Sequence, residues 1–300
     1  MKIGLMHLAQ RESIDGLVES VRRAEAEGFA SLWMPNVFAL DAITALGVAG
    51  RESDRIELGT AVVPIQPRHP FAMAQQALTT AAASGGRFAL GIGLSHKVVI
   101  EDMFGLSFDR PARHMREYLE AMSPLLRGER TNFDGDVYRV SGSVRVPDAG
   151  VVPVLVAALG SAMLRVAGSH AQGTITWMTG IRTLESHIGP CLREAARDAG
   201  RPEPRVVAGV PVALTTDIDA AQKRVGEVLS MYGSLPSYRA MLDREGAASP
   251  ADVALLGDEA TLRAGIERHR EVGVTDFTAS IIPVGPGSRE RTREFLRDLL

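Results

Sequence analysis

The sequence predicts a parallel (β/α)8 barrel with insertions at its rim, and three observations carry the prediction. The chain has 300 residues, about the length of one such barrel. Short apolar runs alternate with longer segments of helical period, as parallel strands and crossover helices do. Eight strands can be counted, beginning near Ile3, Ser31, Ile56, Phe88, Val152, Thr174, Val206 and Thr275. The same count and alternation would also fit an open doubly wound sheet.

Composition and charge limit the classes of protein. Apolar residues make up 45% and charged residues 23%, which suits a folded chain with a large core, and no segment resembles a linker. We therefore predict one domain over residues 1–300. The net charge of −3 comes from dispersed acids and bases, so we expect no nucleic-acid partner.

The single cysteine and the apolar runs indicate the compartment. Cys191 cannot form an internal disulfide, and no zinc-site spacing occurs, so we expect a reducing environment and no bound metal. The N-terminus lacks the pattern of a signal peptide, and no apolar run is long enough to cross a membrane. We therefore expect a cytoplasmic protein without membrane contact.

Local signals place the first helix and two insertions. Ser13 or Asp15 can cap a first helix that Gly28 ends. Residues 131–147 alternate in polarity and predict a β-hairpin, whereas residues 234–257 predict short helices and turns. Both segments break the rhythm of strands and helices, so we expect them at the rim of the barrel.

Two helical segments, residues 42–50 and 71–86, contain no charged residue. The outer helices of a barrel normally present charged residues to water. We therefore expect a homodimer that buries these helices, which follow strands two and three, because exposed apolar surface of this extent usually marks a contact. Burial beneath a rim insertion is the alternative.

Polar residues directly after each strand define the candidate site, because the reactive groups of a barrel enzyme lie where strands end and loops begin. In chain order they are His7; Asn36; Gln66, Arg68 and His69; Ser95, His96 and Lys97; Gly160 and Ser161; and Thr176, Trp177 and Thr179. If these side chains meet at one mouth, they can bind a small-molecule substrate.

Each candidate has a structural alternative. His7 can be a hydrogen-bonded core histidine, and Asn36 can cap the following loop or helix. Arg68 can belong to the entry of a helix that begins at Pro70. Trp177 can be core packing.

Two glycine-containing segments invite comparison with cofactor motifs. Gly91-Ile92-Gly93 lacks the third glycine of the dinucleotide fingerprint and is a weak signal. Residues 157–161, Ala-Ala-Leu-Gly-Ser, precede a helix whose free N–H groups and dipole can hold a phosphate, although Ser161 can also be a plain N-cap. The sequence motifs of nucleophile-elbow hydrolases, P-loop NTPases and His-Glu-x-x-His metalloproteases are absent.

Residues 59–70, GTAVVPIQPRHP, and residues 84–93, SGGRFALGIG, resemble the luciferase-like superfamily. They are similar in particular to its branch that uses coenzyme F420, which includes methylenetetrahydromethanopterin reductase and F420-dependent glucose-6-phosphate dehydrogenase. Residues 95–97 and 109–114 look like an actinobacterial subgroup. The resemblance runs over nearly the whole chain and implies a barrel of the luciferase-like type.

The resemblance also implies roles for matching positions. F420-dependent members carry a non-proline cis peptide in a bulge of strand three, here Ala61–Val62, which backs the deazaflavin ring. The other cofactor-binding positions that we expect are Asn36, Leu94, Ser95, His96, Ala157, Ala158, Gly160, Ser161 and Trp177. Basic residues that are candidates by position for the acidic tail of the cofactor are Lys97, Arg68 and Arg182.

One departure from the family pattern bears on the reaction. F420-dependent sugar dehydrogenases and bacterial luciferase have a histidine just past strand two, where this chain has Val37. Valine cannot donate a proton, which argues against sugar-phosphate oxidation and against the luciferase reaction. His96 occupies the position of a glutamate of the sugar enzyme and becomes the candidate catalytic proton donor, with His7 second.

The resemblance thus implies an F420-dependent oxidoreductase. It would transfer a hydride between the deazaflavin C5 and a C=C, C=N or C=O bond of a small substrate, with residues 234–257 as a lid. The alternatives are an FMN-dependent monooxygenase fed by a separate flavin reductase and a non-catalytic flavin-binding protein.

Overall fold

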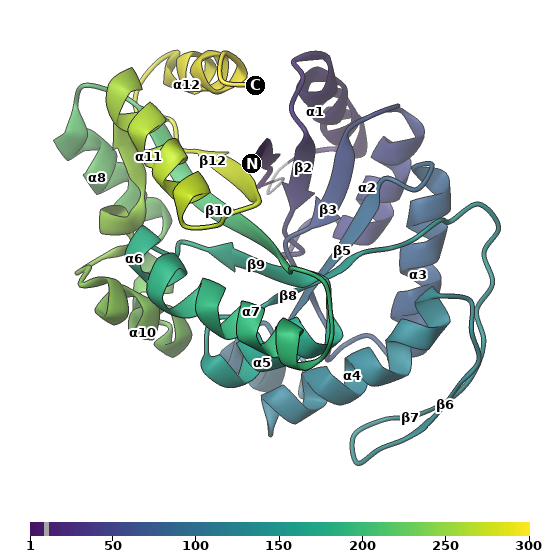
Figure 1. The fold of residues 1–300 in the computed structure, drawn as a ribbon. Coiled ribbons are helices and arrows are strands. Elements are labelled where there is room, and N and C mark those ends of the chain that lie inside the picture. The colour runs from purple at the N-terminus through teal and green to yellow at the C-terminus, as the bar shows by residue number, and fades with distance from the viewer. Residues whose placement is uncertain (9–11) are drawn as a thin grey trace.

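The computed structural model describes residues 1–8 and 12–300, and the strands in this part of the chain close into a parallel barrel (Figure 1). In order around the barrel they are β1 (Lys2–Met6), β2 (Ser31–Met34), β3 (Glu57–Thr60), β5 (Phe88–Gly93), β8 (Val154–Ala157), β9 (Gly173–Trp177), β10 (Arg205–Leu214) and β12 (Asp276–Ile281). β12 pairs with β1, which closes the sheet and excludes the open alternative. All eight predicted strands are confirmed, each beginning within two residues of its predicted start.

Helices surround the barrel (Figure 1). The longer ones are α1 (Ile14–Ala26), α2 (Ala42–Arg51), α3 (Pro70–Ala83), α4 (Pro111–Leu126), α5 (Ser161–His170), α7 (Gly189–Asp198), α8 (Ile218–Val228), α11 (Glu259–Glu271) and α12 (Ser288–Arg297). Ser13 Oγ accepts a hydrogen bond from Gly16 N at 3.1 Å, and the chain leaves α1 through Gly28 at a φ of 91°. The predicted capping and termination of the first helix are therefore confirmed. None of the helices in the described residues is long and apolar enough to span a membrane.

The segment predicted to be a hairpin contains β6 (Thr131–Asp134) and β7 (Arg139–Gly142), which pair antiparallel. The hairpin extends beyond α3 and α4 at the edge of the molecule (Figure 1). Glu117 of α4 is buried and accepts a hydrogen bond from Val137 N at 2.7 Å, so a carboxylate holds the hairpin turn in place.

Short elements form the second rim segment. α9 (Ser230–Ser234) and α10 (Pro236–Glu245) are followed by a 3-10 turn (Pro250–Val253) and by β11 (Leu255–Gly257). β11 pairs parallel with the end of β10 and so extends the sheet outside the barrel. The short helices thus begin four residues before the predicted boundary at Ser234.

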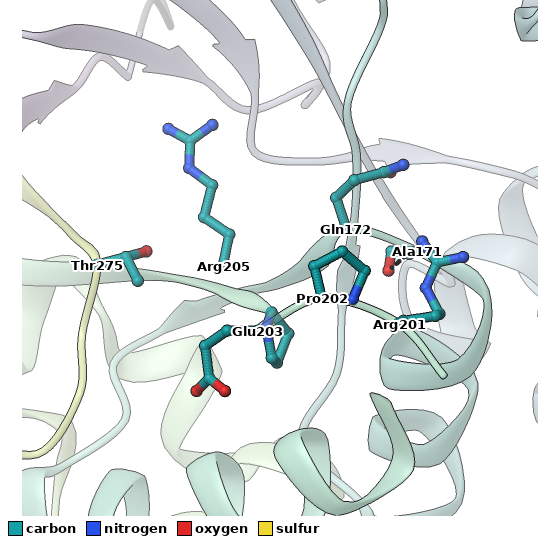
Figure 2. Close-up of a pocket in the computed structure, with 8 residues that line it drawn as sticks. Ala171, Gln172, Arg201, Pro202, Glu203, Arg205 and Thr275 are labelled. Atoms are coloured by element: carbon teal, nitrogen blue, oxygen red, sulfur yellow. Dashed lines mark hydrogen bonds between the residues drawn. The ribbon is translucent and has the colours of Figure 1, made fainter. Parts of the chain in front are cut away.

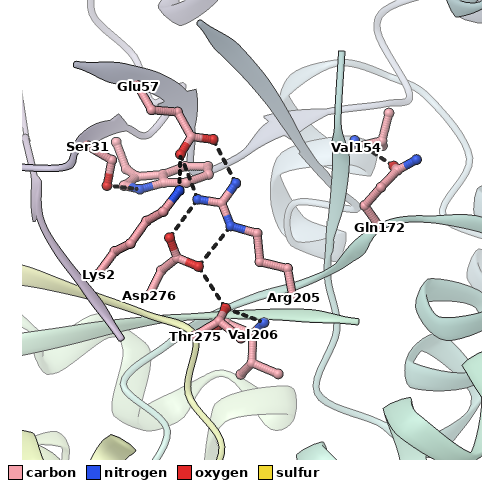
Figure 3. A network of polar contacts seen from close by, with 10 residues as sticks. Lys2, Ser31, Glu57, Val154, Gln172, Arg205, Val206, Thr275 and Asp276 are labelled. Carbon is pink, nitrogen blue, oxygen red and sulfur yellow. Dashed lines mark hydrogen bonds and ion pairs between the residues drawn. The ribbon is translucent and has the colours of Figure 1, made fainter. Parts of the chain in front are cut away.

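An ionic network closes the amino-terminal end of the barrel (Figure 3). Arg205 donates to Asp276 through Nε at 2.8 Å and through Nη2 at 2.6 Å, and to Glu57 at 2.6 and 2.8 Å. Burial disfavours the charged guanidinium, but the bonds to Asp276 and Glu57 outweigh it and raise the pKa of Arg205. The guanidinium also lies 5.4 Å from the ring centroid of the buried Trp33.

A pocket of about 270 Å³ lies beside this network (Figure 2). Arg201, Glu203 and the start of β10 line it, so it opens at the amino ends of the strands. Barrel enzymes carry their chemistry at the opposite, carboxyl end. We therefore assign this pocket and the Arg205 network to the stabilising end of the barrel and look for the site at the other end.

Candidate functional site

The bulge after β3 forms the floor of the mouth. The Ala61–Val62 peptide is cis, as the family resemblance predicts. Thr60 Oγ1 donates to Gly91 O and accepts from Gly91 N, both at 2.8 Å, which ties the bulge to β5. Beyond the bulge, β4 (Val63–Pro64) pairs with β5 again.

The glycines of β5 make room for this bulge. A Cβ at Gly91 would collide with Thr60 O, and a Cβ at Gly93 would come within 2.5 Å of Val62 Cγ2. Gly91-Ile92-Gly93 therefore serves the packing of two strands, in agreement with its weakness as a dinucleotide motif.

Four partly buried side chains form a shelf over the barrel interior, and we call them the shelf: Ala61, Val62, Ala157 and Trp177. They pack against one cluster of buried side chains within the barrel, Met6, Trp33, Ala89, Leu155, Ile175 and Val207. The ring of Trp177 fits because Gly209 lacks a side chain; a Cβ there would lie 2.9 Å from Trp177 Cε3. Indole Nε1 is buried and has no hydrogen-bond partner among the described residues.

The loop after β5 brings His96 to the mouth. Leu94, Ser95 and His96 are half-buried, and Ser95 adopts a φ of 59°, which turns the chain sharply at the end of the strand. His96 O accepts hydrogen bonds from Val99 N and Ile100 N at 2.9 and 3.0 Å, so the residue precedes a helical turn that continues into the π-helix Val99–Met103. Burial lowers the pKa of His96, and the imidazole is therefore neutral at pH 7.

The turn after β8 exposes the start of α5. Gly160 is the N-cap, Ser161 is the first helical residue, and no side chain caps this end. The alternative that Ser161 is the N-cap is therefore wrong. Hydrogen bonds to the N–H groups of residues 161–163 are absent among the described residues, so these groups point their donors to the mouth.

His187 holds this turn from behind. It is 5% exposed, and its Nε2 donates to Leu159 O at 2.8 Å. Cys191 Sγ lies 3.8 Å from Nδ1 of the same ring, which is the geometry of a weak S–H donor to the second nitrogen. Gly168 lets α5 approach α7 closely, because a Cβ there would lie 2.5 Å from Leu192 O.

His7 and Asn36 are placed at the mouth, and both have partners within the chain. His7 Nε2 is hydrogen-bonded to the carboxylate of Glu12, whose other oxygen accepts from Ser20 Oγ at 2.9 Å. Gly16 makes this possible, since a Cβ there would lie 2.7 Å from Glu12 Cγ. Asn36 Oδ1 accepts from Ala42 N at 3.0 Å and thus helps to cap α2, the structural alternative considered for this residue.

The three basic candidates for the cofactor tail are engaged in different ways. Arg68 pairs with Asp41, the N-cap of α2. Lys97 lies 3.6 Å from Glu101 and is largely exposed. Arg182 Nη1 donates to the backbone carbonyl of Glu245 at 3.1 Å and so belongs to the contact between α10 and α6 (Ile181–Thr183).

Sequence reasoning missed the residues that support the mouth from other elements. Tyr232 of α9 lies 6.4 Å from His96 and Tyr238 of α10 lies 6.1 Å from it, measured between ring centroids. Neither tyrosine follows a barrel strand, so the rule that located His96 could not find them. His187 was missed because it lies within a helical segment, and Glu12 because it lies six residues beyond the end of β1. Gln66 was considered only by position, and both atoms of its amide group are buried without a partner among the described residues.

The residues at the mouth fit a cofactor better than a metal ion. The described residues contain no group of three or more His, Cys, Asp or Glu side chains that could hold a metal ion. The mouth instead offers an apolar shelf, uncapped backbone donors at α5 and two histidines. These features suit a planar ring system that carries a phosphate.

Comparison with known proteins agrees with this assignment. A family model described as luciferase-like monooxygenase matches residues 1–299. The 5,10-methylenetetrahydromethanopterin reductase of Methanolobus tindarius is 25% identical over 306 aligned positions, covering 92% of this chain and 93% of that protein.

Two solved structures share the fold. The coenzyme F420-dependent tetrahydromethanopterin reductase of Methanopyrus kandleri superposes with a TM-score of 0.82 at 22% identity, covering 99% of this chain and 97% of that one. The oxygenating constituent of 3,6-diketocamphane monooxygenase from Pseudomonas putida, in complex with FMN, superposes with a TM-score of 0.77 at 17% identity over 99% of this chain and 97% of that one. The chain belongs to the luciferase-like monooxygenase family and is an oxidoreductase of that family.

Proposed function

We propose that this protein is an F420-dependent oxidoreductase that transfers a hydride between the deazaflavin C5 and an unsaturated small molecule with a C=C, C=N or C=O bond. The observation that carries the proposal is the shelf of Ala61, Val62, Ala157 and Trp177 at the carboxyl end of the barrel. The similarity to a methanopterin reductase over nearly the full length of both chains supports it.

The residues at the mouth fit a bound deazaflavin. The shelf offers an apolar surface for a flat ring, and the buried Nε1 of Trp177 and amide of Gln66 are polar groups that still need partners. The uncapped N-terminus of α5 offers backbone donors and a positive dipole end for a phosphate. When bound, F420 would supply a two-electron hydride donor or acceptor, and the chain would supply its position.

Two histidines are candidates for handling the proton of the reaction. His96 is neutral at pH 7, because burial lowers its pKa, so only a small fraction of it is the acidic imidazolium. The ring of His7 is oriented by the hydrogen bond between its Nε2 and Glu12, so Nδ1 is the nitrogen that this contact does not use. We therefore place His7 beside His96 as a proton donor of equal standing, where the sequence alone ranks it second.

The alternative within the family is an FMN-dependent monooxygenase supplied by a separate flavin reductase. The fold shared with the FMN complex of the diketocamphane enzyme keeps this alternative open. A non-catalytic flavin-binding protein would use the same shelf and the same helix N-terminus, and would bind the cofactor without turnover.

A titration with F420 and with FMN, each followed by ligand fluorescence, tests the proposal. We expect F420 to bind at micromolar or lower concentration and FMN at least about tenfold more weakly. Preference for FMN would instead support the monooxygenase, and binding of neither would contradict both.

The variant Gly160→Asp tests the placement of the phosphate. Gly160 has the extended backbone of an N-cap and free space at its Cβ, so an aspartate fits and can cap α5. Its carboxylate would repel a phosphate, and we expect about tenfold weaker F420 binding with stability unchanged or slightly increased. The control is Ala199→Asp at the C-cap of α7. The carboxyl ends of the barrel helices lie at the end opposite the mouth, so F420 affinity should not change.

A further inference from the structure

Four aromatic rings meet at the mouth, and we call them the aromatic wall: His96, Trp177, Tyr232 and Tyr238. Tyr232 is central, with ring centroids 6.4 Å from His96, 6.4 Å from Trp177 and 5.1 Å from Tyr238. These pairs are edge-to-face, which is the favourable arrangement of aromatic rings. The wall joins the loop after β5 and the end of β9 to the helices α9 and α10 at the rim.

The wall adjoins the proposed cofactor site through Trp177. This residue packs against the shelf cluster on one side and, on the other, against the cluster formed by Met178, Val225, Leu229, Ala251 and Ile282 together with both tyrosines. A substrate that receives a hydride must lie against the exposed face of the cofactor ring. A molecule in that position is bordered by the wall.

The polar groups of the wall are uncharged donors. Burial raises the pKa of Tyr232 and of Tyr238, so both phenols stay protonated, and burial lowers the pKa of His96, so the imidazole is neutral. Trp177 Nε1 is an N–H donor without a partner. Hydrogen bonds from either tyrosine hydroxyl are likewise absent among the described residues. Such groups fit a carbonyl oxygen better than a charged one.

The three basic candidates at the mouth each have a contact within the chain. Arg182 is tied to α10 at Glu245, and the Glu245 carboxylate in turn accepts from Thr183 N and Oγ1, both at 2.7 Å. Arg68 pairs with Asp41, and Lys97 lies beside Glu101 on an exposed turn. A phosphate or carboxylate at the wall would therefore have to compete with these contacts for a cation, whereas an uncharged carbonyl compound needs none.

We propose that the aromatic wall is a substrate subsite for flat, uncharged, conjugated carbonyl compounds of the quinone or enone class. The rings supply stacking surface, and the two phenols supply donors to the carbonyl oxygen. This inference rests on the proposed function of the site and names the substrate class it would take.

Tryptophan fluorescence offers a direct test, because the chain has two tryptophans. The variant Trp33→Phe removes the one inside the barrel and leaves Trp177 as reporter. The F420-loaded protein is titrated with menadione, an uncharged naphthoquinone, and with 1,4-naphthoquinone-2-sulfonate, its charged counterpart. We expect saturable quenching by menadione and at least about tenfold weaker binding of the sulfonate. If Trp33→Phe does not fold, calorimetric titration of the wild-type protein with the same two probes gives the comparison.

Tyrosine variants locate the binding. Tyr232→Leu and Tyr238→Leu should each weaken menadione binding about fivefold or more, while Tyr232→Phe, which keeps the ring, should lose less than threefold. Tyr138→Leu is the matched control, since Tyr138 is a half-buried tyrosine of the hairpin turn that packs edge-to-face on Tyr118 of α4. Equal affinity for the two quinones, or equal loss in Tyr138→Leu, would overturn the inference.

The outcomes separate this inference from the proposed function. Binding of F420, followed by its own fluorescence, without preference for the uncharged quinone would refute the subsite and leave the cofactor assignment intact. Preference for menadione by a protein that does not bind F420 would support the subsite and refute the F420-dependent reaction.

Discussion

The substitution Arg205→Met tests the role of the ionic network at the amino end of the barrel (Figure 3). Methionine keeps most of the length of the side chain but removes the charge and all four hydrogen bonds to Asp276 and Glu57. The side chain of Asp276 is 4% exposed and would retain only the hydroxyl of Thr275, at 2.7 Å. Glu57 is more exposed and would keep Lys2 at 3.8 Å.

The magnitude follows from the buried carboxylate. Breaking a buried ion pair by removing one partner costs about 3–5 kcal/mol, because the remaining charge is left without compensation. We expect a loss of this size in the free energy of unfolding. At roughly 2–4 °C per kcal/mol this corresponds to a fall in Tm of about 6–20 °C. Adding Asp276→Asn removes the stranded charge and should restore about 1–3 kcal/mol.

Urea denaturation followed by tryptophan fluorescence measures the loss, since both tryptophans, Trp33 and Trp177, lie in or on the barrel. Arg139→Met is the control: its ion pair with Asp134 on the hairpin is largely exposed, and such a pair contributes less than about 1 kcal/mol. F420 affinity should not change in Arg205→Met, because the network lies at the end of the barrel opposite the mouth. A loss below about 1 kcal/mol, or no recovery in the double variant, would refute the reasoning.

Three further predictions concern His187 behind the turn after β8, the buried His269 of α11 and the uncharged helices α2 and α3. His187→Ala removes the hydrogen bond to Leu159 O. We expect the dissociation constant of FMN to rise about fivefold or more and that of riboflavin, which lacks the phosphate, to change less than twofold. Equal effects on both ligands would contradict a role of His187 at the phosphate. Burial lowers the pKa of His269, so the unfolded chain takes up a proton near pH 6.5 before the native one does, and the free energy of unfolding falls from pH 7.5 to pH 5.5. His269→Gln should lose less stability over this range than the wild type, by at most about 1.4 kcal/mol in urea titrations, and an identical pH dependence would show that His269 does not contribute. We propose the groove of about 500 Å³ between α2 and α3 as the dimer contact, since its exposed residues include the uncharged Thr44, Val48, Gln75 and Thr79. Light scattering should show a dimer for the wild type and a monomer for Val48→Glu. The control Val228→Glu, which changes an equally exposed valine of α8, should remain a dimer.

Much of the candidate site could be located from the sequence because of one property of parallel barrels. All strands point the same way, so residues such as His7, His96 and Ser161 that follow different strands are brought to one mouth by the topology alone. The family resemblance added the cis peptide at Ala61–Val62, which no local pattern predicts. The tyrosines of the wall escaped both arguments, because their placement depends on how α9 and α10 pack onto the rim.

The sequence also left open the choice between function and capping at several positions. Asn36 caps α2 in the structure, while Ser161 does not cap α5. Both residue types favour caps, and a one-residue shift of a helix start decides which is used. This shift is set by packing, such as the close approach of α5 to α7 at Gly168, and is not visible in the local sequence.

The sequence by itself determined the eight strands and the strand ends at which the site lies, because periodicity is a local property of the chain. The closure of these strands into a barrel was implied by the family resemblance and decided by the pairing of β12 with β1. Only the tertiary structure decided which side chains are partners: Glu12 with His7, His187 with Leu159 in the turn after β8, and Tyr232 with His96 and Trp177. The last two contacts join residues on separate elements, and their geometry depends on the packing of whole helices against the barrel.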